Sequence, residues 1–177
     1  MIQVITPQLL DELTAKARES ERHRTNYNFH QTYDENPNRF LNVMVKGTYV
    51  TPHRHTTPPK SESFVVLRGH LLFITFDDAG ELQTVTQLSA AENYGIDIGP
   101  GIWHSIIVES DTAICFEVKP GPYAPASDKD FAPWAPKEGE AGCSEYAEGI
   151  LRRANKFLQK PPDHPGGGSV ADAGLTK

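Results

Sequence analysis

Residues 47–69, GTYVTPHRHTTPPKSESFVVLRG, place two histidines, a glutamate and a closing glycine within one short stretch. His53 and His55 are one residue apart, and Glu62 follows in the next apolar run. The flanking segments have the composition of β-strands, and residues two apart in a strand point to the same face. We therefore expect both imidazoles on one face of an extended segment, where they can share a ligand.

The run before the histidines predicts which face this is. Apolar residues such as Leu41 and Val43 occupy odd-numbered positions, as both histidines do, whereas Asn42 occupies an even-numbered position. In a strand, odd and even positions face opposite sides. If the register continues, the imidazoles lie on the inward face, shielded from water. Pro52 interrupts this pattern, because proline in a strand favours an edge or a bulge. The residues that share the histidine parity are Leu41, Val43, Val45, Tyr49 and Thr51.

A third imidazole follows in GPGIWHSIIV, where His104 comes after a Gly-Pro-Gly turn and inside another β run. Three imidazoles and one carboxylate suit a divalent transition metal, which can be zinc, iron, manganese, nickel or cobalt. The sequence predicts a metal site made of His53, His55, Glu62 and His104. For the His-x-His pair alone, the alternative is two surface histidines in a turn. Arg54 and Trp103 have the opposite parity and are expected to point away from the metal.

The rest of the chain predicts an all-β fold with a helix near each end. Short strands separated by turns are typical of a sandwich or barrel. Thr6 and Pro7 are typical helix-start residues. The polar run 24–38 predicts a loop over the barrel, and 144–159 predicts a second helix. Further β segments are expected at 40–50, 64–76 with a break at Gly69, 94–98, 103–108 and 113–118, with a hairpin turn at 77–80.

We divide the chain into three parts. Residues 1–23 form a strand and helix that pack on the barrel, and 24–160 form the barrel itself. The latter part includes a proline-rich strap after Lys119, anchored by Tyr123, Phe131 and Trp134, and the C-terminal helix. Residues 161–177 have almost no apolar side chains and are expected to be disordered.

The stretch 47–69 resembles the first cupin motif, in which a glycine and five residues precede His-x-His, and a glutamate and six residues precede a second glycine. Gly47 and Gly69 match these positions, although the loop between His55 and Glu62 is longer than in the pattern. Gly101 and His104 match the second motif, whereas Pro100 is one place late and Val108 replaces an asparagine. The resemblance implies a cupin double-stranded β-helix, or jelly-roll barrel, with a bound metal, and dimers are common in such proteins.

A narrower resemblance covers residues 25–146. NYNFHQTYDENPNRFLNVMVKGTYVTPHRHTTPPKSESFVVLRG and GIDIGPGIWHSI look like the WbuC-type cupin-fold metalloproteins. These are small bacterial proteins associated with O-antigen and other surface-polysaccharide gene clusters. The resemblance implies a sugar-linked context but no particular reaction, so the catalytic residues stay unassigned.

Composition excludes several other classes. The net charge of −6 argues against a nucleic-acid binder. The first residues lack a signal peptide, and no stretch reaches transmembrane length, so a cytoplasmic protein is expected. Cys115 is expected in the core, and two cysteines do not make a disulfide framework. His30, Arg39 and Lys60 are candidate substrate-binding residues, each with a plain surface role as the alternative.

Three functions follow from these observations. The first is a metal-dependent isomerase or epimerase acting on a sugar or sugar nucleotide. The second is a metal-dependent dioxygenase, which has the same ligand set. The third is a non-catalytic barrel that binds a carbohydrate-derived small molecule. Fold alone does not decide among them, because one fold supports many functions.

Overall fold

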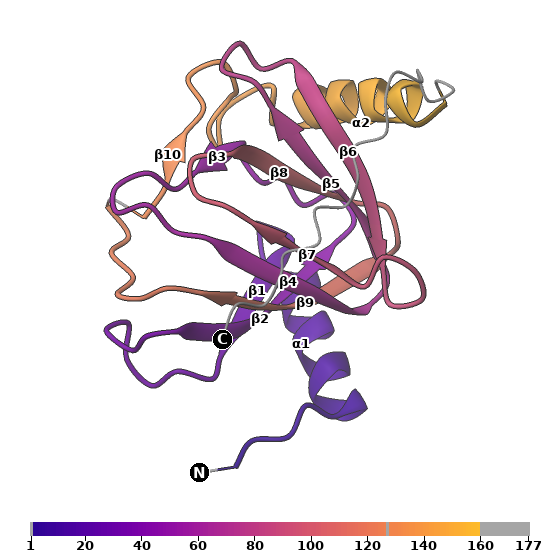
Figure 1. Cartoon of the computed structure of the whole chain (residues 1–177). Coiled ribbons are helices and arrows are strands. Elements are labelled where there is room, and N and C mark those ends of the chain that lie inside the picture. The colour runs from indigo at the N-terminus through magenta and orange to yellow at the C-terminus, as the bar shows by residue number, and fades with distance from the viewer. Residues whose placement is uncertain (1, 127, 160–177) are drawn as a thin grey trace, which may run out of the picture.

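The computed structural model describes residues 2–126 and 128–159, and the predicted tail 161–177 lies outside the described residues. Two helices flank ten strands, most of which belong to a closed double-layered body (Figure 1). The elements are α1 (Pro7–Glu19), β1 (Arg24–Asn28), β2 (Asn38–Val45), β3 (His53–Arg54), β4 (Glu62–Arg68), β5 (His70–Phe76), β6 (Leu82–Ser89), β7 (Gly95–Ile98), β8 (Trp103–Val108), β9 (Thr112–Lys119), β10 (Asp130–Phe131) and α2 (Cys143–Gln159).

The strands form two five-stranded antiparallel sheets. The first sheet has the order β1-β2-β9-β4-β7, and the second has the order β10-β3-β8-β5-β6. Neighbours in each sheet are mostly distant in sequence, which is the crossing connectivity of a jelly roll. This is the cupin double-stranded β-helix with a helix at each end, as the sequence predicts.

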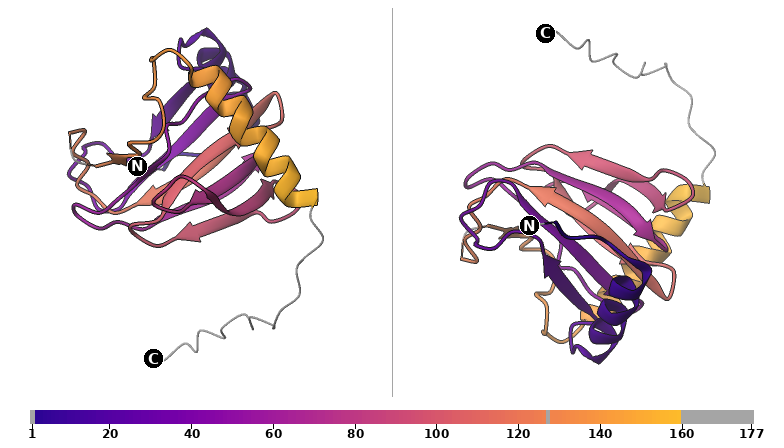
Figure 2. Two further views of the ribbon diagram at one scale, coloured as in Figure 1. Left: turned by 90° about the horizontal axis from the view of Figure 1, so that it is seen from above. Right: turned by 90° about the horizontal axis from the view of Figure 1, so that it is seen from below.

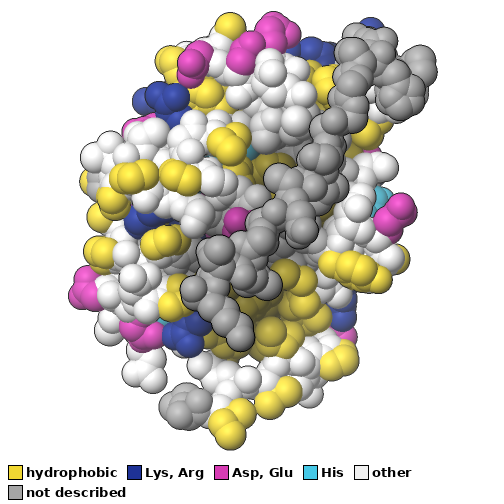
Figure 3. All heavy atoms as spheres, viewed as in Figure 1, with side chains coloured by type: hydrophobic (Ala, Val, Ile, Leu, Met, Phe, Trp, Pro, Cys, Tyr) yellow, Lys and Arg dark blue, Asp and Glu magenta, His cyan; other side chains and the backbone are white. Residues whose placement is uncertain are grey.

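Three apolar clusters hold the layers together. One fills the space between the sheets and includes Met44, Phe73 and Cys115. A second joins α2 and the strap to the outer face of the second sheet, and a third joins α1 to the outer face of the first. Figure 2 shows α2 lying across the body, with α1 on a different side. On the face seen in Figure 3, only small areas of histidine are visible, in keeping with the burial of the central histidines.

The predicted inward parity of the first long strand is wrong. Leu41 and Val43 lie on the outer face of β2, beneath α1. Its inner face carries Met44, which packs between the sheets, and Asn42. The register does not continue to the histidines, because the chain turns at Gly47 (φ +94°) and crosses from the first sheet to the second before β3 begins.

The predicted loop over 24–38 is also only partly right. Residues Arg24–Asn28 form the edge strand β1, which pairs with β2. Their side chains are exposed or half-buried and mostly polar, so no apolar alternation marks the strand. Its backbone hydrogen bonds to β2 make it a strand, and these leave little signal in composition.

Both predicted helices are present. Thr6 is the N-cap of α1, since its hydroxyl accepts a 3.1 Å hydrogen bond from the Leu9 amide. Helix α2 buries Ile150 and Ala154, whereas Phe157 is 39% exposed.

The proline-rich strap is ordered where it is described. Trp134 packs against Phe76, with 5.2 Å between ring centroids, and Tyr123 is half-buried. Phe131 is not the predicted anchor, because it is 49% exposed at the edge of the second sheet. Its strand, β10, is instead held by pairing with β3.

Gly69, between β4 and β5, provides a test of this packing. It has φ +75°, and a Cβ there would lie 2.0 Å from the Thr112 carbonyl oxygen. Gly47 has a similar φ of +94° but open space around it. Positive φ costs a non-glycine residue about 1–2 kcal/mol, so Gly47→Ala is expected to lose about that much unfolding free energy. Gly69→Ala should lose clearly more in urea denaturation, and equal losses would show that the backbone contact is not tight.

Candidate metal centre

Four buried side chains converge inside the barrel at one end. His53 lies in β3, His55 directly follows it, and His104 lies in β8, where it is the register partner of His53. Glu62 is the first residue of β4 and reaches them from the opposite sheet. One ligand atom of each side chain lies within 4.8 Å of the others, and all four residues are at most 4% exposed. The structure thus brings together all four residues that the sequence singles out.

Backbone carbonyls orient the three imidazoles. The Nδ1 atom of His53 lies 3.0 Å from the Thr51 oxygen, and that of His104 lies 2.9 Å from the Ile102 oxygen. His55 Nδ1 contacts the Asp128 carbonyl oxygen. A carbonyl oxygen only accepts, so each Nδ1 carries the proton and each Nε2 keeps its lone pair. This outer hydrogen bond is the usual way in which proteins orient a metal-binding histidine.

Two of the Nε2 atoms that point into the cluster lack hydrogen-bond partners. The Nε2 atoms of His55 and His104 are buried and have no hydrogen bond among the described residues. They face Glu62, at 2.8 Å from Oε1 and 3.4 Å from Oε2 respectively. Burial lowers the pKa of His53 well below its usual value, which keeps the imidazole neutral. Buried imidazole nitrogen atoms without hydrogen-bond partners, next to a carboxylate, fit a divalent metal ion.

Glu62 is held in its ionised form. Burial alone would raise its pKa, but contacts with His104 and His55 and the charge of Lys119 together lower the pKa well below its usual range. The Lys119 ammonium lies 3.4 Å from Glu62 Oε1. A carboxylate that stays ionised while buried is a suitable metal ligand.

A second layer of charge surrounds this group. The Asp128 carboxylate in the strap pairs with Lys60 at 2.7 Å and with Lys119 at 2.9 Å. All three side chains are at most 6% exposed, so the two ammonium groups share one buried counterion. The strap therefore helps to position the candidate site, both through the Asp128 carbonyl and through its carboxylate.

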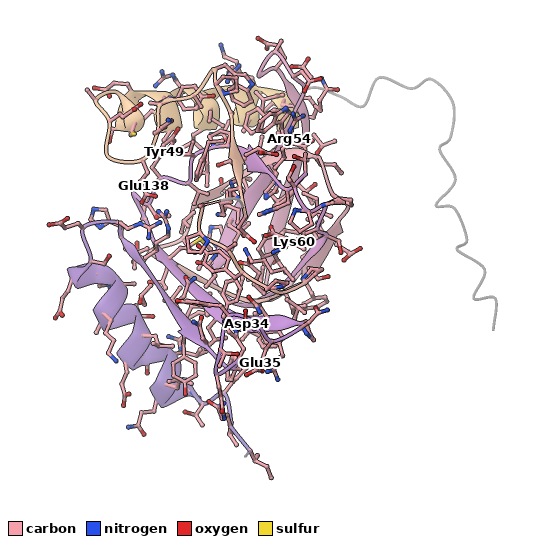
Figure 4. The ribbon with its side chains drawn as sticks, turned by 90° about the vertical axis from the view of Figure 1, so that its left-hand side faces the viewer. Asp34, Glu35, Tyr49, Arg54, Lys60 and Glu138 are labelled. Atoms are coloured by element: carbon pink, nitrogen blue, oxygen red, sulfur yellow. The ribbon has the colours of Figure 1, made fainter. Side chains whose placement is uncertain are left out.

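A cavity of about 530 Å³ is lined by Lys119, which contacts Glu62, although none of the four cluster residues lines it. Its size is typical of small-molecule sites. Figure 4 views the protein from the side of the strap, with Lys60 between Arg54 and Glu35. The residues that line the cavity and matter below are Arg22, Arg24, His30, Tyr33, Asn42, Glu117, Lys119, Tyr123 and Lys129.

Glu117 is an acidic residue in the wall of this cavity, and its pKa is raised above the usual value. Its Oε2 accepts a 3.2 Å hydrogen bond from Asn42 Nδ2, and it is 4% exposed. Burial and the charge of Glu62 raise its pKa to about 8, against the opposing effect of Lys119. At neutral pH this carboxyl group is therefore mostly protonated and can donate a proton.

The three candidate substrate-binding residues fall in different places. His30 lines the cavity, and its Nδ1 accepts a 3.1 Å hydrogen bond from the Arg39 amide. Lys60 is buried and its ammonium is already paired with Asp128. Arg39 does not line this cavity, since its guanidinium pairs with Glu35 at 2.7 Å beside a separate depression. Arg54 stacks on Trp103 and both point away from the cluster, as expected.

Sequence reasoning missed much of the cavity wall. Glu117 and Lys119 are two residues apart in β9, an otherwise apolar strand, and share the inward parity of Cys115. Charged residues on the buried face of a strand were the signal that could have found them. Asp128 and Lys129 lie in the strap, where no periodicity indicates direction.

Comparison with known families gives a partial match. The model of a domain of unknown function, DUF6016, matches residues 5–88, just under half of the 177-residue chain. The matched part contains His53, His55 and Glu62 but ends before His104. No curated protein matches the chain.

Solved structures share the fold. The capsular polysaccharide assembling protein CapF from Staphylococcus aureus superposes with a TM-score of 0.54 at 21% identity, over 63% of this chain and 30% of CapF. An uncharacterised conserved protein with a double-stranded β-helix domain from Klebsiella pneumoniae has a TM-score of 0.53 at 16% identity, over 75% of this chain and 98% of its own. The chain thus corresponds to less than a third of the CapF length, and the similarity is one of fold. Among the described residues, neither helix has the length and apolar character needed to cross a membrane.

The raised pKa of Glu117 predicts a pH-dependent stability difference. The unfolded chain loses this proton near the ordinary pKa of 4.5, whereas the folded protein keeps it to about 8. The wild type should therefore lose stability relative to Glu117→Gln as pH rises from 5 to about 8, and the difference should level off above that. Thermal unfolding of both proteins across this pH range measures it.

A difference in stability between the two proteins that does not change with pH would contradict the raised pKa of Glu117. Other charged groups near Glu117, which include Glu62, Lys119 and Lys129, are shared by the two proteins. The half-exposed carboxylate of Glu35 offers a matched control, because Glu35→Gln removes an acid outside the cavity.

Proposed function

We propose that this protein is a metal-binding cupin that acts on a sugar or sugar nucleotide, as an isomerase or epimerase in surface-polysaccharide biosynthesis. The metal ligands in this proposal are His53, His55, Glu62 and His104. The observation that carries it is the set of buried imidazole nitrogen atoms that face Glu62 without hydrogen-bond partners. A protein interior seldom leaves such atoms unpaired unless another group binds them.

The chemistry of the site supports an open metal centre more than a structural one. A bound divalent ion would supply Lewis-acid polarisation of a carbonyl or hydroxyl oxygen. The apolar cluster between the sheets already stabilises the barrel, and Phe73 stacks on His104 with 5.6 Å between centroids. The cavity lies next to the cluster through Lys119, which lines its wall and contacts Glu62.

Residues of the chain can supply the proton transfers that isomerisation or epimerisation needs. Glu117 holds a proton at neutral pH at the cavity wall, and the ionised form accepts one. His30 presents its second ring nitrogen from the other side, because Nδ1 is fixed by the Arg39 amide. Asp128 of the strap contacts His55, and all four candidate ligands are buried, which restricts access of bulk water.

Two resemblances support the sugar context. It comes from the resemblance to WbuC-type cupin proteins, and CapF, which shares the fold, is described as a capsular polysaccharide assembling protein. The cavity is polar and large enough for a monosaccharide derivative, which supports this class of ligand. The proposal also includes a cytoplasmic homodimer, which gel filtration with light scattering would test.

Metal content is the first test. Elemental analysis of the wild type is expected to find about one equivalent of zinc, iron, manganese, nickel or cobalt. His53→Ala and His104→Ala should each lose most of it, because each removes one ligand and the affinity depends on all of them. His70→Ala is a matched control, since His70 is exposed at the start of β5.

The outcome also separates the kinds of function. Absence of bound metal, with none taken up on soaking the purified protein, would refute the metal-binding proposal. If iron is found and substrate turnover consumes oxygen, the protein is a dioxygenase and not an isomerase. Tight binding of a sugar nucleotide without turnover would identify a non-catalytic binding protein.

A further inference from the structure

One lysine in the cavity wall has no acidic partner. Lys129 precedes β10 and lines the cavity, and its ammonium forms no ion pair or hydrogen bond among residues 2–126 and 128–159. The neighbouring cations are paired. Arg24 binds Glu138 at 2.6 Å, and Lys119 binds Asp128 at 2.9 Å.

Lys129 is half-buried, and its surroundings disfavour its charge. Burial and the positive charge of Lys119 lower its pKa, although Glu62 and Glu117 oppose this effect. Glu117 does not compensate for the charge at neutral pH, because its own pKa is raised to about 8. A cation in this position gains most from an anion that enters the cavity.

The cavity as a whole favours such an anion. Arg22, Arg24, Lys119 and Lys129 line it, whereas Glu117 is the acidic residue in its wall. This arrangement contrasts with the chain as a whole, which has a net charge of −6. Arg22 and Arg24 are paired with Glu138, and Lys119 is paired with Asp128. Among the described residues, Lys129 is therefore the cation of the wall that is left to attract an anionic small molecule.

The rest of the wall suits a hydroxylated body attached to the anion. Tyr33 and Tyr123 lie together, with 5.2 Å between ring centroids, and Asn42 adds an amide beside Glu117. Aromatic faces and amides are typical contacts for sugar rings and their hydroxyl groups.

We propose that the cavity binds a small molecule that carries a carboxylate or phosphate group, with this group held by Lys129. The anion subsite stands on Lys129 and the cavity alone, whereas the sugar-like body rests on the proposed function. The candidate ligands are therefore acidic sugars and sugar phosphates, and neutral sugars are excluded.

Isothermal titration calorimetry with three probes tests this inference. Glucuronate, glucose 1-phosphate and glucose share a sugar ring and differ in charge. The wild type should bind one or both charged probes and should bind glucose at least about tenfold more weakly, since only the charged probes gain a charge-assisted hydrogen bond. Lys129→Gln should weaken the charged probe by about tenfold, and Lys156→Gln, on the exposed face of α2, should not.

Each outcome decides a separate point. A preference for glucuronate or for glucose 1-phosphate identifies the anion as carboxylate or phosphate. Equal binding of glucose, no binding of either charged probe, or unchanged binding by a folded Lys129→Gln variant would overturn the inference. Thermal unfolding establishes that the variant is folded.

The titrations are repeated on chelator-treated and metal-loaded protein. Binding that depends on Lys129 in both samples supports the anion subsite even if the metal proposal fails. If binding requires the metal and is unchanged in Lys129→Gln, the anion binds to the metal ion and not to Lys129. The inference would then be wrong.

Discussion

The candidate site depends on the ion pairs that Asp128 makes. Its carboxylate lies between the Lys60 and Lys119 ammonium groups, and its carbonyl oxygen accepts from His55. All of these groups are buried, and removing one partner of a buried pair costs about 3–5 kcal/mol because the other charge is left unpaired. The position of His55 and the charge of Lys119 beside Glu62 therefore both depend on one residue of the strap.

The interior of the barrel has an apolar part, which stabilises the fold, and a polar part, which lines the cavity. The space between the sheets is apolar around Phe73 and Met44, where it stabilises the fold. Towards the strap, the same strands carry polar inward residues, such as Glu117 and Lys119 at the end of β9. Continuous strands with an apolar part and a polar part hold the candidate ligands on a rigid frame, which limits their movement.

The fold and the four central residues could be predicted from sequence, whereas the strap residues Asp128 and Lys129 could not. His53, His55 and His104 lie in short motifs with recognisable spacing, and Gly69 and Thr6 have local roles that a sequence shows. The parity argument from Leu41 failed because the chain changes sheets between β2 and β3. Asp128 meets His55 from 73 positions away, and such a contact leaves no local pattern.

Two adjacent residues of the strap have different roles. Asp128 faces the buried lysines, and Lys129 faces the cavity. A segment outside both main sheets thus contains one residue that supports the centre and another that meets the ligand. Lys129 can change with little disturbance to the barrel, since loops tolerate change better than sheets do, whereas the buried ion pairs of Asp128 constrain that residue. Related barrels that keep the four central residues can therefore diverge in what they recognise through the strap alone.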